Sequence, residues 1–173
     1  MVSKALPALI VLLLSVGLLT MAHSGGEVWK DPASGLTWQV QPADKKLNWE
    51  KAKAYCQNLK LGGHSDWHLP TASELRSLLR GCPQTVNNGA CRVNDECLGH
   101  GCWNESCAGC ALNGGPGPNG AYWPAEMAGE NGWYWSSSAV GRSVNGAWLF
   151  SFHYASIVPS LTYGECRVRC VRN

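Results

Sequence analysis

Nine cysteines constrain the fold of this 173-residue chain more than any other feature of its sequence. All of them follow an apolar N-terminal run at residues 6–19, and six of them fall within residues 82–110. If that run directs export, cysteines at this density indicate disulfides formed in an oxidising compartment. Because nine is an odd number, at least one thiol is free or pairs with another molecule.

The N-terminus has the three parts of a secretory signal peptide. Lys4 supplies the positive charge, residues 6–19 are apolar, and small or polar residues follow. We predict a signal peptide over residues 1–24, with cleavage after Ala22 or Ser24. The alternative is an uncleaved anchor, although the run is shorter than the roughly 20 residues that span a bilayer comfortably. After cleavage we expect no stable membrane insertion, and a secreted, periplasmic or cell-surface location.

Residues 25–173 have the length of one domain with a real hydrophobic core. Charged residues make up only 15% of the chain and the net charge is +2, which excludes the electrostatic footprint of a nucleic-acid-binding protein. Nine tryptophans and twenty glycines indicate a loop-rich fold with many short segments that carry aromatic side chains.

A first helix is expected after Asn48, which is a good N-cap. Apolar residues follow at helical spacing from Trp49 to Leu59, and Gly62 with Gly63 should end the helix.

A second, shorter helix is expected after Thr71. Pro70 disfavours helical backbone before it, and Thr71 with Glu74 has the spacing of a capping box. The helix should end before Gly81. The polar linker Ser65–Asp66–Trp67 between the two helices is interpreted as structural.

A cysteine-rich insert is predicted at about residues 81–120, where no hydrophobic period is present. Its six cysteines allow fifteen pairings, among which the sequence does not choose. Short strands with alternating side chains are expected on both sides of the insert. They are residues 28–31, 36–40, 133–138, 147–154, 157–163 and 166–172.

The last of these runs alternates between cysteine and arginine. Cys166, Val168 and Cys170 share one face of the predicted strand, whereas Arg167 and Arg169 share the other. We therefore expect the cysteines to point inward and both arginines to point outward.

Candidate ligand-binding residues come from the later strands and their turns. Aromatic rings beside polar groups suit sugars, and arginine suits sulfate or carboxylate groups. The candidates are Arg142, His153, Tyr154, Arg167 and Arg169, with Trp133 and Trp148 as weaker additions. The alternative is that the tryptophans belong to the core and that the arginines are merely solvated.

A metal site is not predicted. Cys97, His100, Cys102, Cys107 and Cys110 have spacings that zinc could use, but disulfides are favoured in an exported chain. Calcium would need a cluster of carboxylate and amide oxygens, which no motif here supports. No residue set has the spacing of a catalytic site, so we expect neither a cofactor nor an enzyme.

Three motifs together resemble a known bacterial family. They are WxxAxxYCxxLxLGGxSDWxLPTxxEL at residues 49–75, YWSSS at residues 134–138 and VRCVR at residues 168–172. This combination resembles the domain named for the C-terminal domain of the Legionella collagen-like adhesin. The resemblance implies an α+β, C-type-lectin-like fold with two short helices, a small, mostly antiparallel twisted sheet, long loops and neighbouring termini.

The resemblance also implies a disulfide between the first helix and the final strand, which would be Cys56–Cys170 here. If the insert cysteines (Cys82, Cys91, Cys97, Cys102, Cys107 and Cys110) then pair among themselves, Cys166 is left as a buried free thiol. Alternatively, Cys166 pairs with an insert cysteine and leaves another one unpaired.

The family resemblance implies a recognition role outside the cytoplasm. Its relatives suggest binding of carbohydrate or polyanionic polysaccharide, such as a surface glycan, at the cell envelope or surface. The alternative is a structural envelope protein that docks another envelope protein through the insert. An enzyme of the formylglycine-generating type, which shares the broad fold, is disfavoured because Cys166 and Cys170 would lie roughly 13 Å apart on one strand.

Overall fold

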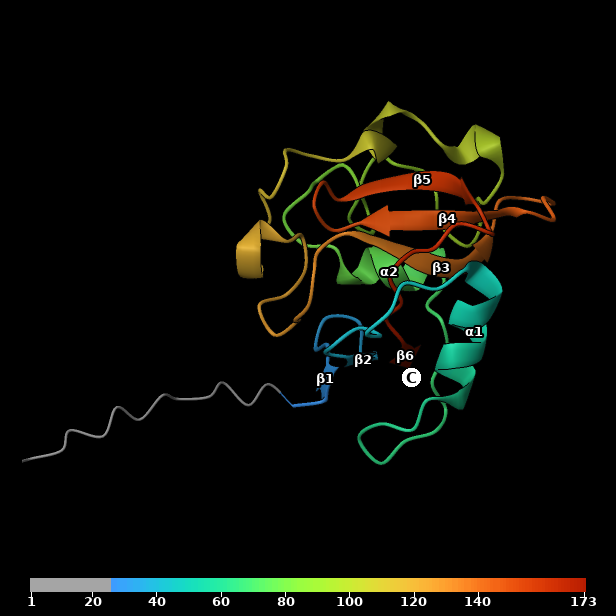
Figure 1. Ribbon diagram of the computed structural model, residues 1–173. Coiled ribbons are helices and arrows are strands. Elements are labelled where there is room, and N and C mark those ends of the chain that lie inside the picture. The colour runs from blue at the N-terminus through green and yellow to red at the C-terminus, as the bar shows by residue number, and fades with distance from the viewer. Residues whose placement is uncertain (1–25) are drawn as a thin grey trace, which may run out of the picture.

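The computed structural model describes residues 26–173, so the predicted signal peptide lies outside the described residues. Over these residues the chain has the predicted α+β class, with two α-helices, three short 3-10 helices between residues 100 and 120, and two three-stranded antiparallel sheets (Figure 1). Its elements are β1 (Val28–Lys30), β2 (Thr37–Gln39), α1 (Trp49–Asn58), α2 (Ala72–Leu78), β3 (Trp133–Ala139), β4 (Gly146–Ser151), β5 (Ser156–Leu161) and β6 (Val171–Arg172).

The strands form two sheets, whereas the expectation was a single small one. One sheet has the order β1–β2–β6 and the other has the order β3–β4–β5. The first and last strands of the domain, β1 and β6, therefore lie in one sheet on either side of β2, which keeps the two ends of the domain close together, as the resemblance implies. Both α1 and α2 pack against β3, which therefore lies at the centre of the molecule.

Both helices begin where the sequence predicts. The Asn48 side chain accepts a hydrogen bond from the Lys51 backbone N–H at 3.0 Å. Thr71 and Glu74 form the reciprocal capping box, in which each side chain accepts from the other residue's backbone N–H. Such local bonds satisfy amides that have no partner within a helix, and a lost N-cap costs about 1 kcal/mol.

The end of the first helix was predicted too late. α1 stops at Asn58, and the chain continues in extended form. Gly62 and Gly63 instead make a turn of positive φ, which brings Leu61 and His64 into a backbone pair. These glycines allow a tight reversal after the helix but do not terminate it.

The linker between the helices is held from both sides. The Trp67 ring is buried, and its indole N–H donates to the Leu61 carbonyl at 3.3 Å. Asp66 forms a two-point ion pair with Arg172 of β6 at 2.7 and 2.9 Å. The structure thus supports the interpretation of this linker as structural.

The final run is not one strand, and the prediction that Arg169 points outward is wrong. The run bridges the two sheets: Arg167 pairs with Tyr134 of β3, whereas Val171 joins β2. Protein therefore covers both faces of the run, and Arg169 is fully buried. Its guanidinium donates to the backbone carbonyls of Gln39, Val40 and Ala128.

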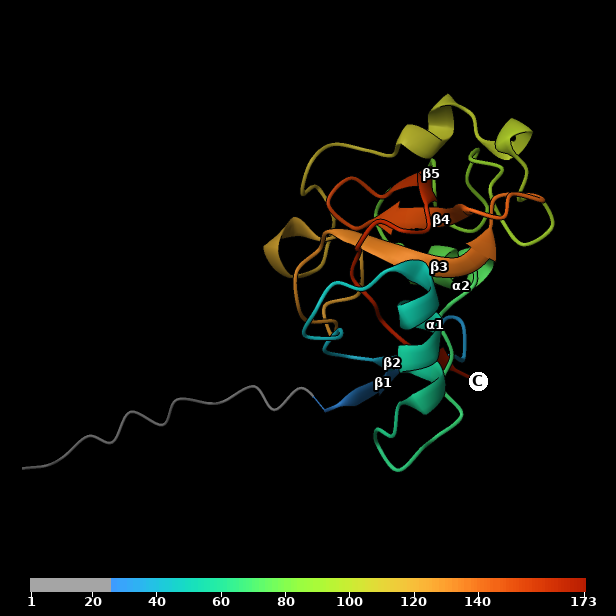
Figure 2. The same ribbon diagram turned by 45° about the vertical axis from the view of Figure 1, so that its right-hand side comes forward.

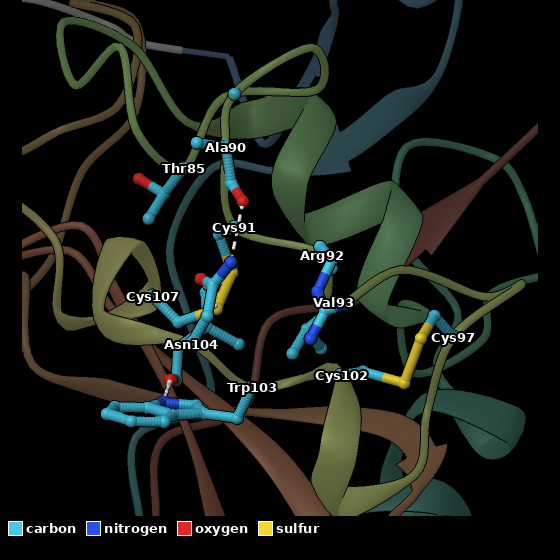
Figure 3. Close-up of a disulfide and its surroundings, with 12 residues drawn as sticks. Thr85, Ala90, Cys91, Arg92, Val93, Cys97, Cys102, Trp103, Asn104 and Cys107 are labelled. Atoms are coloured by element: carbon cyan, nitrogen blue, oxygen red, sulfur yellow. Dashed lines mark hydrogen bonds between the residues drawn. A yellow bond between two sulfur atoms is a disulfide. The ribbon is translucent and has the colours of Figure 1, made fainter.

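Eight of the nine cysteines form disulfides, and Cys166 is free. Cys56 pairs with Cys170, as the resemblance implies. The six insert cysteines pair among themselves, as Cys82–Cys110, Cys91–Cys107 and Cys97–Cys102. Figure 3 shows the last two of these bridges. Figures 1 and 2 show the insert arching over β5, at the end of the molecule away from the β1–β2–β6 sheet.

A buried arginine organises the first loop of the insert. Arg76 of α2 is almost completely buried and donates hydrogen bonds to backbone carbonyls of the loop, including those of Thr85, Cys91 and Val93. Burial lowers the pKa of Arg76 from its ordinary value, yet a guanidinium remains charged in proteins. The loop carbonyls thus take the place that a carboxylate usually fills around a buried arginine.

Candidate functional site

A cavity of about 320 Å³ brings together three of the candidate ligand-binding residues that the sequence singled out. We call it the Arg167 pocket. Its lining includes Lys46, Trp133, His153, Glu165, Cys166 and Arg167. Arg167, His153 and Trp133 were predicted as candidate ligand contacts, and the structure places all three around one space.

Backbone hydrogen bonds between distant segments build this pocket. The Arg167 N–H donates to the Trp133 carbonyl at 2.9 Å, and the Arg167 carbonyl accepts from the Trp135 N–H at 3.1 Å. Leu47 and Cys166 exchange two further backbone bonds, at 2.9 and 3.0 Å. Backbone hydrogen bonds therefore hold together the segments that carry the pocket walls.

The aromatic wall comes from the first residue of β3. Trp133 pairs with Ser151 across the sheet, and 37% of its surface is exposed. His153 follows β4 in the turn that leads to β5, so it lies at the same end of the sheet. The exposed Tyr154 ring packs edge-on against His153, with 6.3 Å between the ring centroids. This end of the sheet thus presents three aromatic rings.

The insert supports the turn that carries His153 and Tyr154. A side chain at Gly109 would collide with the Tyr154 carbonyl, since an added Cβ would lie 2.1 Å from that oxygen. Next to it, the Cys110 N–H donates to the same carbonyl at 2.7 Å. The disulfide-bonded insert therefore rests directly on the backbone of the site.

Charges of both signs surround the pocket. Arg167 forms an ion pair with Glu130, whose side chain is 76% exposed, while only 16% of the arginine side chain is exposed. Lys46 and Glu165 add one further charge of each sign. An exposed carboxylate is easily displaced, because surface ion pairs are worth at most about 1 kcal/mol. An incoming anion can therefore compete with Glu130 for the guanidinium.

Cys166 is the one free cysteine of the chain, as one of the two predicted arrangements requires. The thiol lines the pocket but is half-buried rather than fully buried. Burial raises the pKa of the Cys166 thiol to about 11, and the ammonium of Lys46 offsets only part of that effect. Since the thiolate is the reactive form, Cys166 is a poor nucleophile at neutral pH.

Three predicted contacts lie elsewhere. Arg142 is exposed in the turn between β3 and β4, at the end of β3 opposite Trp133 and roughly 20 Å away at strand rise. Arg169 is buried, so its assignment as a ligand contact is wrong. Trp148 is also fully buried and donates to the Leu98 carbonyl at 3.0 Å, which makes it a core residue.

The cysteines considered for zinc are all bonded to sulfur. Cys97, Cys102, Cys107 and Cys110 each belong to a disulfide, so none of them offers a thiolate to a metal. Among residues 26–173, no group of three or more His, Cys, Asp or Glu side chains is placed to hold a metal ion.

The sequence model of the Lcl C-terminal domain family matches residues 27–172, which is nearly all of the described structure. The chain belongs to this family. No curated protein matches the chain. The family match confirms the resemblance drawn from the three sequence motifs. Four disulfides in a small Lcl C-terminal domain are typical of an extracellular module. Within residues 26–173, no helix is long and apolar enough to cross a membrane.

This Lcl C-terminal domain has a second and larger cavity, of about 560 Å³, that was not predicted from the sequence. It lies beside α1 and is lined in part by Gln39, Asp44, Leu47, Tyr55 and Leu61. We call it the Tyr55 pocket. Tyr55 is one of the apolar residues predicted at helical spacing between Trp49 and Leu59, and no motif distinguishes a core tyrosine from one that lines a cavity.

Proposed function

We propose that the domain is an exported recognition module that binds carbohydrate, including acidic polysaccharide, through the Arg167 pocket. One observation carries the proposal: Trp133, His153 and Arg167, from three separate segments, line the same cavity. We also propose that the role is binding without catalysis, at the cell surface, in the periplasm or in the secreted state.

The chemistry of the pocket suits a sugar that carries an acidic group. An exposed indole offers an apolar face to a pyranose ring, while its neighbours offer hydrogen bonds to the edge of that ring. The planar guanidinium of Arg167 matches sulfate or carboxylate in a two-point bond. The acidic group would take the place of Glu130, so binding exchanges one ion pair for another.

The test is the affinity of the oxidised domain for a heparin-derived hexasaccharide, measured by calorimetry. We expect affinity to fall as salt rises, because the contacts are electrostatic. Arg167→Ala should weaken binding about tenfold or more, whereas Arg142→Ala, the matched loss of an exposed arginine at the far end of the sheet, should change it little. Equal losses in the two variants would indicate unspecific charge attraction and would refute the proposed site.

A glycan array on the same domain separates carbohydrate recognition from other roles. We expect hits among acidic glycans that are lost in Arg167→Ala. No hit at all, together with an unchanged fold, would contradict carbohydrate binding.

A further inference from the structure

In the Tyr55 pocket, hydrogen bonds fix the orientation of one buried amide, that of Gln39, and of the hydroxyl group next to it. Gln39 is buried, with only 5% of its surface exposed, and its side-chain oxygen accepts a hydrogen bond from the Cys170 backbone N–H at 3.0 Å. Since a backbone N–H can only donate, that bond fixes which end of the amide is oxygen. The Gln39 nitrogen must therefore be the atom that lies 3.0 Å from the Tyr55 hydroxyl.

This orientation decides the role of Tyr55. The amide nitrogen can only donate, so the Tyr55 oxygen accepts that bond and keeps its own hydrogen. Within the described part of the chain, the hydroxyl makes no other hydrogen bond. Tyr55 lines the cavity, and its hydroxyl is thus a preset donor for a ligand oxygen.

The rest of the lining combines apolar side chains with exposed charged residues, Glu27, Asp44 and Lys45, which we call the rim. Pro42, Leu47 and Leu61 supply apolar walls. Glu27 and Asp44 bring two carboxylates to the lining, against one ammonium from Lys45. Carboxylates accept hydrogen bonds from hydroxyl groups but repel anions, so the rim favours an uncharged ligand that carries hydroxyls.

We infer that the Tyr55 pocket binds a neutral pyranose ring. The ring's apolar face would lie on the leucine and proline walls, one ring oxygen or hydroxyl would accept from Tyr55, and other hydroxyls would donate to Asp44 and Glu27. A volume of about 560 Å³ is within the range of small-molecule sites.

The Tyr55 pocket is independent of the Arg167 pocket. The two cavities share no lining residue, although adjacent residues of one short segment contribute to both: Lys45 and Leu47 line the first and Lys46 lines the second. Leu47 also exchanges backbone hydrogen bonds with Cys166 of the Arg167 pocket, but no side chain belongs to both linings. This inference therefore stands whether or not the Arg167 pocket binds an acidic glycan.

The test uses ligand-observed saturation-transfer NMR on the oxidised domain. The probes are methyl glucoside, methyl galactoside, methyl mannoside and N-acetylglucosamine, with glucuronate as the charged comparison. We expect saturation of at least one neutral probe. Any saturation of glucuronate should come from the Arg167 pocket, so Arg167→Ala should abolish the glucuronate signal and leave the neutral one. Tyr55→Phe should weaken the neutral probe about fivefold to tenfold through the loss of one hydrogen bond.

Two further variants locate the binding. Asp44→Ala changes an exposed rim residue and should weaken the neutral probe severalfold, which keeps the test valid if Tyr55→Phe does not fold. Glu50→Ala removes an exposed carboxylate of α1 that is not among the cavity's lining residues and should leave the neutral probe unaffected, as should Arg167→Ala. The inference is overturned if no neutral probe is saturated, or if Tyr55→Phe and Asp44→Ala bind the probe as the unaltered domain does.

Discussion

The guanidinium of Arg169 lies over the indole ring of Trp123, with its Cζ atom 4.8 Å from the ring centroid. The Tyr134 ring lies close to the same group, at 5.4 Å. Burial lowers the pKa of Arg169 from its ordinary value, but aromatic faces and carbonyl oxygens stabilise the cation in place of a carboxylate. Arg169 therefore joins the end of β2 to the loop before β3.

Replacing Arg169 should damage the fold before it affects any ligand. Arg169→Ala removes the donor to the carbonyls of Gln39, Val40 and Ala128, of which Val40 keeps the Ala128 backbone N–H. We expect this loss to lower the free energy of unfolding by about 3 kcal/mol or more. Urea titration measures this loss. The exposed Arg142→Ala is the control and should change stability by less than about 0.5 kcal/mol. Similar values for the two variants would show that Arg169 is not structural.

The disulfides should contribute differently to the stability of the domain, according to the length of chain that each one closes. Cys56–Cys170 spans 114 residues and Cys97–Cys102 spans only 5. In the chain-entropy model these bridges contribute about 5 and about 2 kcal/mol. Removal of each pair by double alanine substitution, followed by thermal unfolding, should thus destabilise the first variant far more. Equal losses of stability in the two variants would contradict the conclusion that Cys56–Cys170 is the more stabilising disulfide.

The pair of His68 and Glu74 predicts a pH effect on stability. The His68 ring nitrogen lies 2.8 Å from a Glu74 oxygen, and this bond raises the pKa of His68 above its ordinary value of 6.5. A raised pKa means that the stabilisation is complete below about pH 6.5 and is lost as pH rises through the folded-state value. Because the histidine side chain is 37% exposed, we expect an effect of about 1 kcal/mol or less.

The measurement for this pair is the melting temperature between about pH 6 and pH 8.5. His68→Gln keeps a hydrogen-bonding side chain but does not titrate, so the decline across this window should become shallower. An unchanged decline in His68→Gln would mean that other groups cause it.

Replacing Glu130 should strengthen ligand binding, whereas most substitutions at a binding site weaken it. Its carboxylate occupies Arg167, and Glu130→Gln should release that guanidinium. We expect the affinity for the heparin-derived hexasaccharide to rise about threefold to tenfold, since both competition and repulsion are removed. Glu126→Gln, which removes another exposed carboxylate from the same loop, is the control. Weaker binding in Glu130→Gln would show that Glu130 contacts the ligand instead of competing with it.

Local interactions explain what the sequence allowed us to predict. The Asn48 cap and the Thr71–Glu74 capping box involve residues three apart, so the sequence contains both partners of each bond. The disulfide Cys56–Cys170 came from the family resemblance, which supplies the long-range pairing that spacing alone leaves open.

Arg169 shows why the rest could not be predicted. Alternation along a strand indicates two faces but not which of them meets solvent, and the run around Arg169 crosses from one sheet to the other. The Tyr55 pocket was missed for a related reason. Its lining combines residues such as Glu27, Gln39, Tyr55 and Leu61, whose proximity depends on how β1, β2 and α1 pack.

The most direct test of carbohydrate recognition by the Arg167 pocket is a titration of ¹⁵N-labelled domain with the heparin-derived hexasaccharide. Two exposed tryptophans serve as internal reporters, because Trp133 and Trp103 are 37% and 39% exposed but only Trp133 lines the pocket. We predict that the indole resonance of Trp133 and the side-chain resonance of Arg167 shift together and saturate, while the indole resonance of Trp103 stays in place. A shift of Trp103 without one of Trp133, or no saturable shift at all, would contradict the account.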